Sequence, residues 1–108
     1  MSQFDPLQGI VAYPITPFTD GGDAVDTTEL AALVERLVTS GVHAIAPLGS
    51  TRESAYRSEA EFDAVVDTTV AAVDGRLPVV VGASDLTTTN TIRRARYSER
   101  AGADAAMI

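Results

Sequence analysis

The segment Gly49-Ser50-Thr51-Arg52-Glu53-Ser54 places a glycine directly before two adjacent hydroxyl side chains. Glycine allows a tight backbone turn, after which successive N–H groups and both hydroxyls can point at one anion, such as a carboxylate or a phosphate. A hydroxyl-rich turn that only caps its own backbone fits the same residues equally well. The segment therefore gives an anion-binding hypothesis for Ser50 and Thr51, with the self-capped turn as its alternative.

Several other chemistries are excluded by the residue types that the chain lacks. All eight basic side chains are arginine, so no lysine can form a Schiff base or bind a phosphate in a P-loop. The chain has no cysteine and a single histidine, His43, so thiolate chemistry and multi-histidine metal sites are excluded. His43 lies within an apolar run, which favours a structural role. We expect no metal and no cofactor.

Charge and hydropathy limit the kinds of molecule that the chain can bind and the compartment in which we expect it. The formal net charge is −7, which argues against nucleic acid and anionic membranes because both require a basic surface. Apolar residues make up 45% of the chain, as in a globular domain. No apolar run reaches the roughly 18 residues of a membrane span, and residues 1–8 lack the features of a signal peptide. These features predict a cytoplasmic protein.

Apolar runs alternate with amphipathic stretches along the chain. Candidate strands cover residues 9–15, 42–48, 77–82 and 103–108, and candidate helices cover about 27–40, 58–73 and 90–100. Asp26 or Thr27 can cap the first helix, and Ser58 with Glu61 forms a possible capping box for the second. The resulting β-α-β-α-β-α-β order predicts an α/β fold with parallel strands.

This order fits either a small doubly wound sheet or part of a (β/α)8 barrel. A complete barrel needs about 250 residues, so only the amino-terminal half of one would fit. We therefore expect residues 1–108 to form one domain that is truncated within its fourth strand. In both architectures Ser50 and Thr51 follow the carboxyl end of the second strand, which is where α/β folds place their sites.

Aromatic and basic side chains elsewhere have simpler interpretations. Arg93, Arg96 and Arg100 share one face of the third helix and predict a solvated surface. Tyr13, Tyr56 and Tyr97 predict packing roles, although Tyr56 stays a candidate because it lies close to the hydroxyl segment.

Taken together, several short motifs resemble the opening of the dihydrodipicolinate synthase / N-acetylneuraminate lyase family. The resemblance covers nearly the whole chain, and its motifs are specific in combination rather than singly. They are Thr16-Pro17-Phe18, Asp20-Gly21, Asp26, Gly41-Val42, Gly49-Ser50-Thr51-x-Glu53-Ser54, Gly75-Arg76-x-Pro78-Val79-Val80-Val81-Gly82 and Ala101-Gly102-Ala103-Asp104.

The resemblance implies about the first three and a half βα units of a (β/α)8 TIM barrel, from a class I aldolase or lyase that acts on pyruvate or a related 2-oxo acid. It implies that Ser50 and Thr51 bind the carboxylate of the 2-oxo acid and that Ser50 also takes part in a proton relay. Glu53 would support the loop. Members of the family are usually homo-oligomers. Their Schiff-base lysine and their proton-shuttling tyrosine correspond to positions beyond Ile108.

Two residues depart from the family pattern. Arg52 stands where the family has a glycine, and Arg57 stands where it usually has an apolar residue near a subunit contact. Because the chain lacks the lysine, we expect it to be inactive alone. The alternatives are a non-catalytic half-barrel that self-associates or pairs with a partner chain, and a small anion-binding module.

Overall fold

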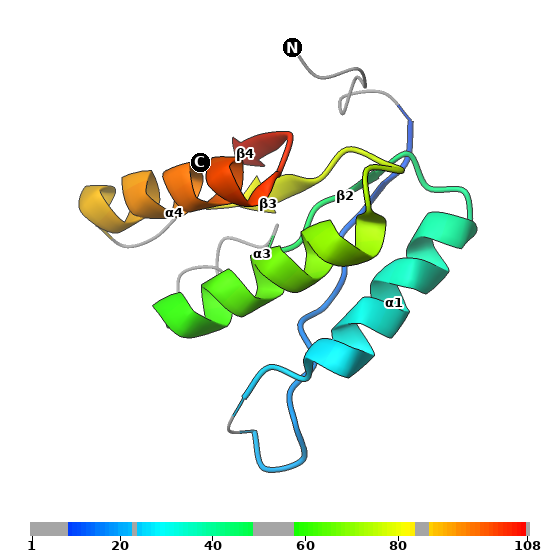
Figure 1. Cartoon of the computed structure of the whole chain (residues 1–108), viewed down its shortest axis with the longest axis horizontal. Coiled ribbons are helices and arrows are strands. Elements are labelled where there is room, and N and C mark those ends of the chain that lie inside the picture. The colour runs from blue at the N-terminus through cyan, green and yellow to red at the C-terminus, as the bar shows by residue number, and fades with distance from the viewer. Residues whose placement is uncertain (1–8, 23, 49–57, 84–86, 108) are drawn as a thin grey trace.

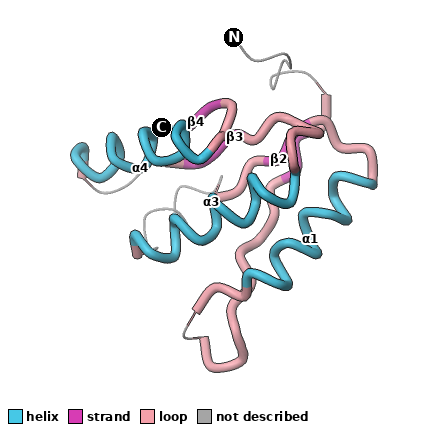
Figure 2. The backbone as a smooth tube through the Cα atoms, in the orientation of Figure 1, coloured by secondary structure: helices cyan, strands magenta, loops and turns pink. Residues whose placement is uncertain are grey.

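The computed structural model describes residues 9–22, 24–48, 58–83 and 87–107. Within these ranges strands and helices alternate along the chain, as the sequence predicts (Figure 2). The elements are β1 (Val11–Ala12), α1 (Thr27–Thr39), β2 (Ala44–Ile45), α3 (Glu59–Val73), β3 (Val80–Gly82), α4 (Thr88–Ala101) and β4 (Ala105–Met107).

The strands are parallel and follow one another in space in chain order. β1 pairs with β2, β3 pairs with β4, and a bridge between Ile45 and Val79 joins the two pairs. The Ile45 N–H donates to the Pro78 carbonyl at 3.1 Å, and the Gly82 N–H donates to the Pro47 carbonyl at 3.0 Å. Each strand is shorter than its apolar run, since hydrogen-bonded pairing occupies only part of each run.

Local side-chain chemistry defines where the helices begin. Asp26 caps α1 by accepting from the Glu29 N–H at 3.0 Å. The predicted capping box of α3 is confirmed, because the Glu61 N–H donates to Ser58 Oγ and the Ser58 N–H donates to the Glu61 carboxylate. Thr87 caps α4, so this helix begins at Thr88, two positions before the predicted start at Asn90.

The core lies where α1 and α3 pack on β2 and β3. In Figure 1, α3 lies between α1 and α4, and it contacts both. The apolar positions predicted for the second helix are all buried, which confirms that face: they are Phe62, Val65, Val66, Thr69 and Val73. The rest of the buried apolar cluster comes from Leu30, Val34, Ile45, Leu48, Val79 and Val81.

Candidate functional site

The strand that leads to the hydroxyl segment is held from both sides. On one side the His43 N–H donates to the Ile10 carbonyl at 2.7 Å, and the Ala46 N–H donates to the Ala12 carbonyl at 2.8 Å. On the other side Pro47 accepts from β3. Residues 44–48 are consequently all buried. The last of them, Leu48, has a φ of 58°, a left-handed conformation that is uncommon for a branched side chain.

The predicted site residues Ser50 and Thr51 lie outside the described residues, as do Arg52, Glu53, Tyr56 and Arg57. The structure does define the two ends between which they occur. One end is Leu48, which is buried and follows β2 after two residues, and the other is Ser58, the cap of α3.

The carboxylate of Glu59, the first residue of α3, contacts two arginines of α4. Its Oε1 accepts from Arg94 Nε at 3.1 Å, and its Oε2 pairs with Arg93. The Arg93 guanidinium also donates to the Asp63 carboxylate at 2.9 Å. This hydrogen bond to Asp63 raises the pKa of Arg93. The start of α3 is therefore attached to α4 by opposite charges.

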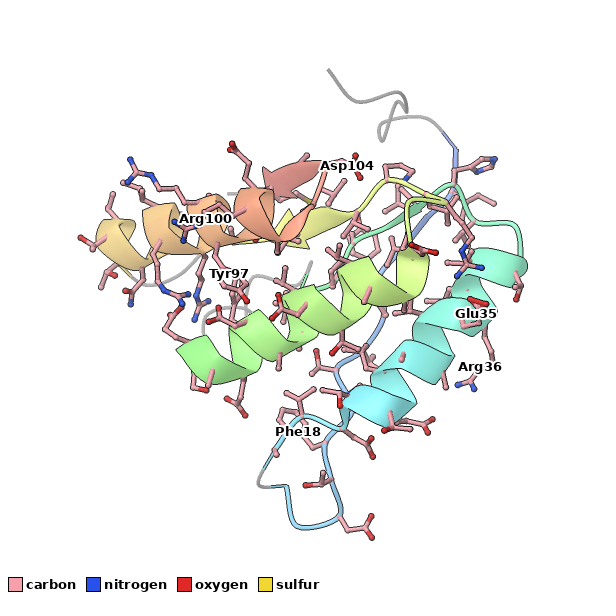
Figure 3. The ribbon with its side chains drawn as sticks, viewed as in Figure 1. Phe18, Glu35, Arg36, Tyr97, Arg100 and Asp104 are labelled. Carbon is pink, nitrogen blue, oxygen red and sulfur yellow. The ribbon has the colours of Figure 1, made fainter. Side chains whose placement is uncertain are left out.

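Tyr97 extends this contact by one helical turn along α4. In Figure 3 its side chain projects from α4 toward α3. Its hydroxyl lies 2.8 and 2.7 Å from the two carboxylate oxygens of Asp67, and its ring meets Phe62 edge to face. The hydrogen bond to Asp67 and the desolvation of the phenol raise the pKa of Tyr97 to about 12.

Two expectations for side chains outside the segment need correction, those for Arg93 and Tyr13, and the one for His43 is confirmed. Arg93 does not lie on a purely solvated face, because it pairs with α3; Arg96 does lie exposed. Tyr13 is 59% exposed rather than packed. His43 is exposed rather than enclosed by the apolar run, and its Nδ1 accepts the Ile10 N–H at 2.8 Å. This hydrogen bond gives His43 a structural role, as predicted.

In the described part of the chain, no three His, Cys, Asp or Glu side chains lie together so that they could hold a metal ion. A depression of about 370 Å³ lies on the outer face of α4, lined by Thr89, Ile92, Arg93, Arg96 and Arg100. In the same part of the chain, no helix combines the length and apolarity that crossing a membrane requires.

Sequence reasoning missed one feature of this region, the burial of Arg94. Its side chain is only 1% exposed, and its guanidinium carbon lies 4.9 Å from the centroid of the Phe62 ring. The spacing of Arg94 from Ser98 and Ala101 along the helix was the available signal, since these positions recur on one helical face.

Comparison with solved structures assigns the fold. The model superposes on dihydrodipicolinate synthase from Bacillus clausii with a TM-score of 0.86 and 36% identity, over 95% of this chain and 34% of that chain. It matches dihydrodipicolinate synthase from Acinetobacter baumannii, solved in complex with pyruvate, with a TM-score of 0.84 and 29% identity, over 92% of this chain and 34% of that chain.

Comparison of sequences agrees. The model of the dihydrodipicolinate synthetase family matches residues 6–108, so the chain belongs to this family. Over 108 residues it is 44% identical to a 4-hydroxy-tetrahydrodipicolinate synthase of Sorangium cellulosum, covering 100% of this chain and 36% of that protein. The chain thus spans about a third of the length of the curated relatives it matches.

Proposed function

We propose that the chain supplies the 2-oxo acid carboxylate site of a Schiff-base lyase or aldolase. In this proposal its elements are about the first three and a half βα units of a (β/α)8 barrel, and the protein is cytoplasmic. The observation that carries the proposal is the position of Gly49-Ser50-Thr51, which follows β2 after three residues in a chain of the dihydrodipicolinate synthetase family.

Ser50 and Thr51 would bind the carboxylate of pyruvate or a related 2-oxo acid through their hydroxyls and backbone N–H groups. Hydroxyl and amide donors suit a carboxylate because each hydrogen bond to a charged acceptor is stronger than one between neutral groups. Ser50 would in addition pass a proton, because a hydroxyl can both donate and accept. The Acinetobacter baumannii relative was solved with pyruvate, which supports this class of ligand.

Catalysis by the 108 residues alone is not part of the proposal. A class I aldolase stores the electrons of the breaking bond in an imine formed with a lysine, and this chain contains none. We expect no cleavage of a 2-oxo acid aldol adduct above the uncatalysed rate. Cleavage by the purified chain alone would contradict this expectation.

Ligand binding tests the carboxylate site directly. We expect pyruvate to shift amide signals of the 108-residue chain in heteronuclear NMR, and Ser50→Ala or Thr51→Val to weaken its affinity roughly tenfold, the value of one charge-assisted hydrogen bond. Thr89→Val, an exposed hydroxyl on α4, serves as the control and should leave the affinity unchanged. Absence of pyruvate binding, or equal binding by all variants, would refute the site.

A second candidate function, a half-barrel that associates with another copy of itself, is favoured by the surface around β1. Ile10, Tyr13 and Ile15 are 63%, 59% and 72% exposed, and exposed apolar side chains along a strand invite pairing. We expect sedimentation equilibrium to give a mass above the 11.3 kDa of one chain. Ile15→Asp should lower that mass and Ile92→Asp, equally apolar but on α4, should not. A monomer at all concentrations would eliminate this candidate.

A further inference from the structure

Arg94 places a charged group in the interior of the fold. Its side chain is 1% exposed, and it is the largest of the fully buried side chains in the described part of the chain. Removing a charge from water is costly unless the charge is paired and hydrogen-bonded. The surroundings of Arg94 therefore have to offset the cost of burying its guanidinium charge. The groups that do so indicate the role of the residue.

Part of the compensation comes from the first turn of α3. Glu59 Oε1 accepts from Arg94 Nε at 3.1 Å, and the guanidinium stacks over the ring of Phe62 with 4.9 Å between its carbon and the ring centroid. The other oxygen of Glu59 pairs with Arg93, whose guanidinium is more exposed than that of Arg94. Two planar groups from α4 thus fix both the position and the direction of one carboxylate.

Glu59 occupies the position at which α3 begins. The residue before it, Ser58, carries the helix cap and also ends the part of the chain that follows Leu48. Any displacement of Glu59 moves this cap, because the two residues are adjacent on the backbone. Fixing Glu59 consequently fixes Ser58, the first described residue after the stretch of sequence that contains Ser50 and Thr51.

We propose that Arg94 is a positioning residue for the 2-oxo acid site, acting through Glu59 on the start of α3. The expected effect of Arg94 on pyruvate binding rests on the proposed function. The expected effect of Arg94 on the start of α3 does not. Stability alone is a weak reason to bury such a pair, since well-packed apolar residues of similar volume are often as stable or more so. Charged contacts from two neighbouring arginines to the two oxygens of one carboxylate instead define one relative position of the two helices.

The test compares Arg94→Met with Arg76→Met. Both remove an arginine–glutamate pair, but Arg76 lies just beyond the carboxyl end of α3, where it contacts Glu35 of α1 and the last carbonyls of α3. Three quantities are measured on the full 108-residue chain: the thermal midpoint, hydrogen exchange of individual α3 amides by NMR, and pyruvate affinity. The informative amide is that of Glu61, which donates to Ser58 Oγ, and the internal reference is that of Asp74 at the other end of α3.

In Arg94→Met we expect the Glu61 amide to exchange roughly tenfold faster, the equivalent of one lost charge-assisted hydrogen bond. The thermal midpoint shows whether the variant is destabilised as a whole. The Asp74 amide should not change, and pyruvate affinity should fall by about the same factor as the Glu61 exchange rate rises. Arg94→Lys keeps the charge without the planar stack and should give an intermediate exchange rate, which keeps the test valid if the methionine variant does not fold. Arg76→Met should leave the Glu61 amide unchanged.

Unchanged exchange of Glu61 in both Arg94 variants would overturn the proposal. A uniform rise in exchange over the whole of α3 would also overturn it, because it would indicate only lost stability. If the wild-type chain binds no pyruvate while the Glu61 amide responds as expected, the carboxylate site is refuted and the fixing of α3 by Arg94 stands. If pyruvate binds and the Arg94 variants do not change its affinity, the positioning role in binding is refuted.

Discussion

The contact between Gly9 and His43 offers a sharp test of how β1 is held beside β2. Gly9 has a φ of +82°, and a Cβ atom added to it would lie 2.3 Å from His43 Nδ1 and 2.9 Å from His43 Cβ. Rotating the imidazole away relieves the first contact but breaks the 2.8 Å hydrogen bond from the Ile10 N–H. The second contact involves an atom that no side-chain rotation can move far, so the backbone would have to shift.

Gly9→Ala should therefore carry two costs. The left-handed backbone costs alanine about 1–2 kcal/mol, and loss of the Ile10 hydrogen bond costs about 1 kcal/mol, for a total of roughly 2–3 kcal/mol. Gly41 provides a matched control, because its φ is +95° and a Cβ there meets nothing within 4 Å. Gly41→Ala should be destabilised only by the cost of the left-handed backbone. Urea denaturation monitored by circular dichroism measures both free energies of unfolding.

The double variant Gly9→Ala/His43→Ala isolates the contact itself. With the imidazole removed, the clash is absent and the hydrogen bond is already lost, so the two costs should fall short of additivity by about 1 kcal/mol. Equal destabilisation by Gly9→Ala and Gly41→Ala, or strict additivity in the double variant, would refute the reasoning.

Three further outcomes follow from single side chains. Within the residues that the structure describes, the buried Thr69 hydroxyl has no hydrogen-bond partner. Thr69→Val should therefore raise the free energy of unfolding by about 1 kcal/mol in urea denaturation, whereas Thr39→Val, which removes a bonded and exposed hydroxyl, should give no gain. Because the pKa of Tyr97 is raised from 10.0 to about 12, its contribution to stability should be complete below pH 10 and lost as the pH rises through 12. Phenolate absorbance should show one late-titrating tyrosine that is absent in Tyr97→Phe; simultaneous titration of all tyrosines would contradict the contact with Asp67. Ser58→Ala should lower the midpoint of thermal unfolding by the equivalent of about 1 kcal/mol, and an unchanged midpoint would contradict the capping box.

The helices were predictable because the information that defines them is local. The spacing of Phe62, Val65, Val66, Thr69 and Val73 defines a buried face without knowledge of any neighbour, and all five positions are buried. The capping box needs only four consecutive residues and is present as predicted. The strands were harder to delimit, because pairing depends on partners more than 30 positions away, as between Val11 and Ala44.

The partners of Arg94 were not predictable from its neighbours in the chain. Its spacing from Ser98 and Ala101 indicates a shared helical face, but not that Arg94 is buried while Arg93 is paired and Arg96 is exposed. The difference arises from Glu59 and Phe62, which precede Arg94 by more than 30 residues and belong to another helix. Tyr13 shows the reverse error. Its place in an apolar run predicted that the ring is packed, but the ring is exposed.

Leu48 and Ser58 flank the stretch of sequence that contains Ser50 and Thr51. Both depend on contacts with elements that come later in the sequence. Leu48 follows β2 after two residues, and Pro47 beside it accepts a hydrogen bond from the Gly82 N–H of β3. Ser58 precedes the carboxylate that α4 holds through Arg93 and Arg94. We infer that Leu48 and Ser58 become fixed only when β3 and α4 have docked, because the contacts beside them come from those two elements. In refolding experiments, protection of the Glu61 amide should therefore appear together with that of α4, and pyruvate binding should not precede either; earlier binding would contradict this order.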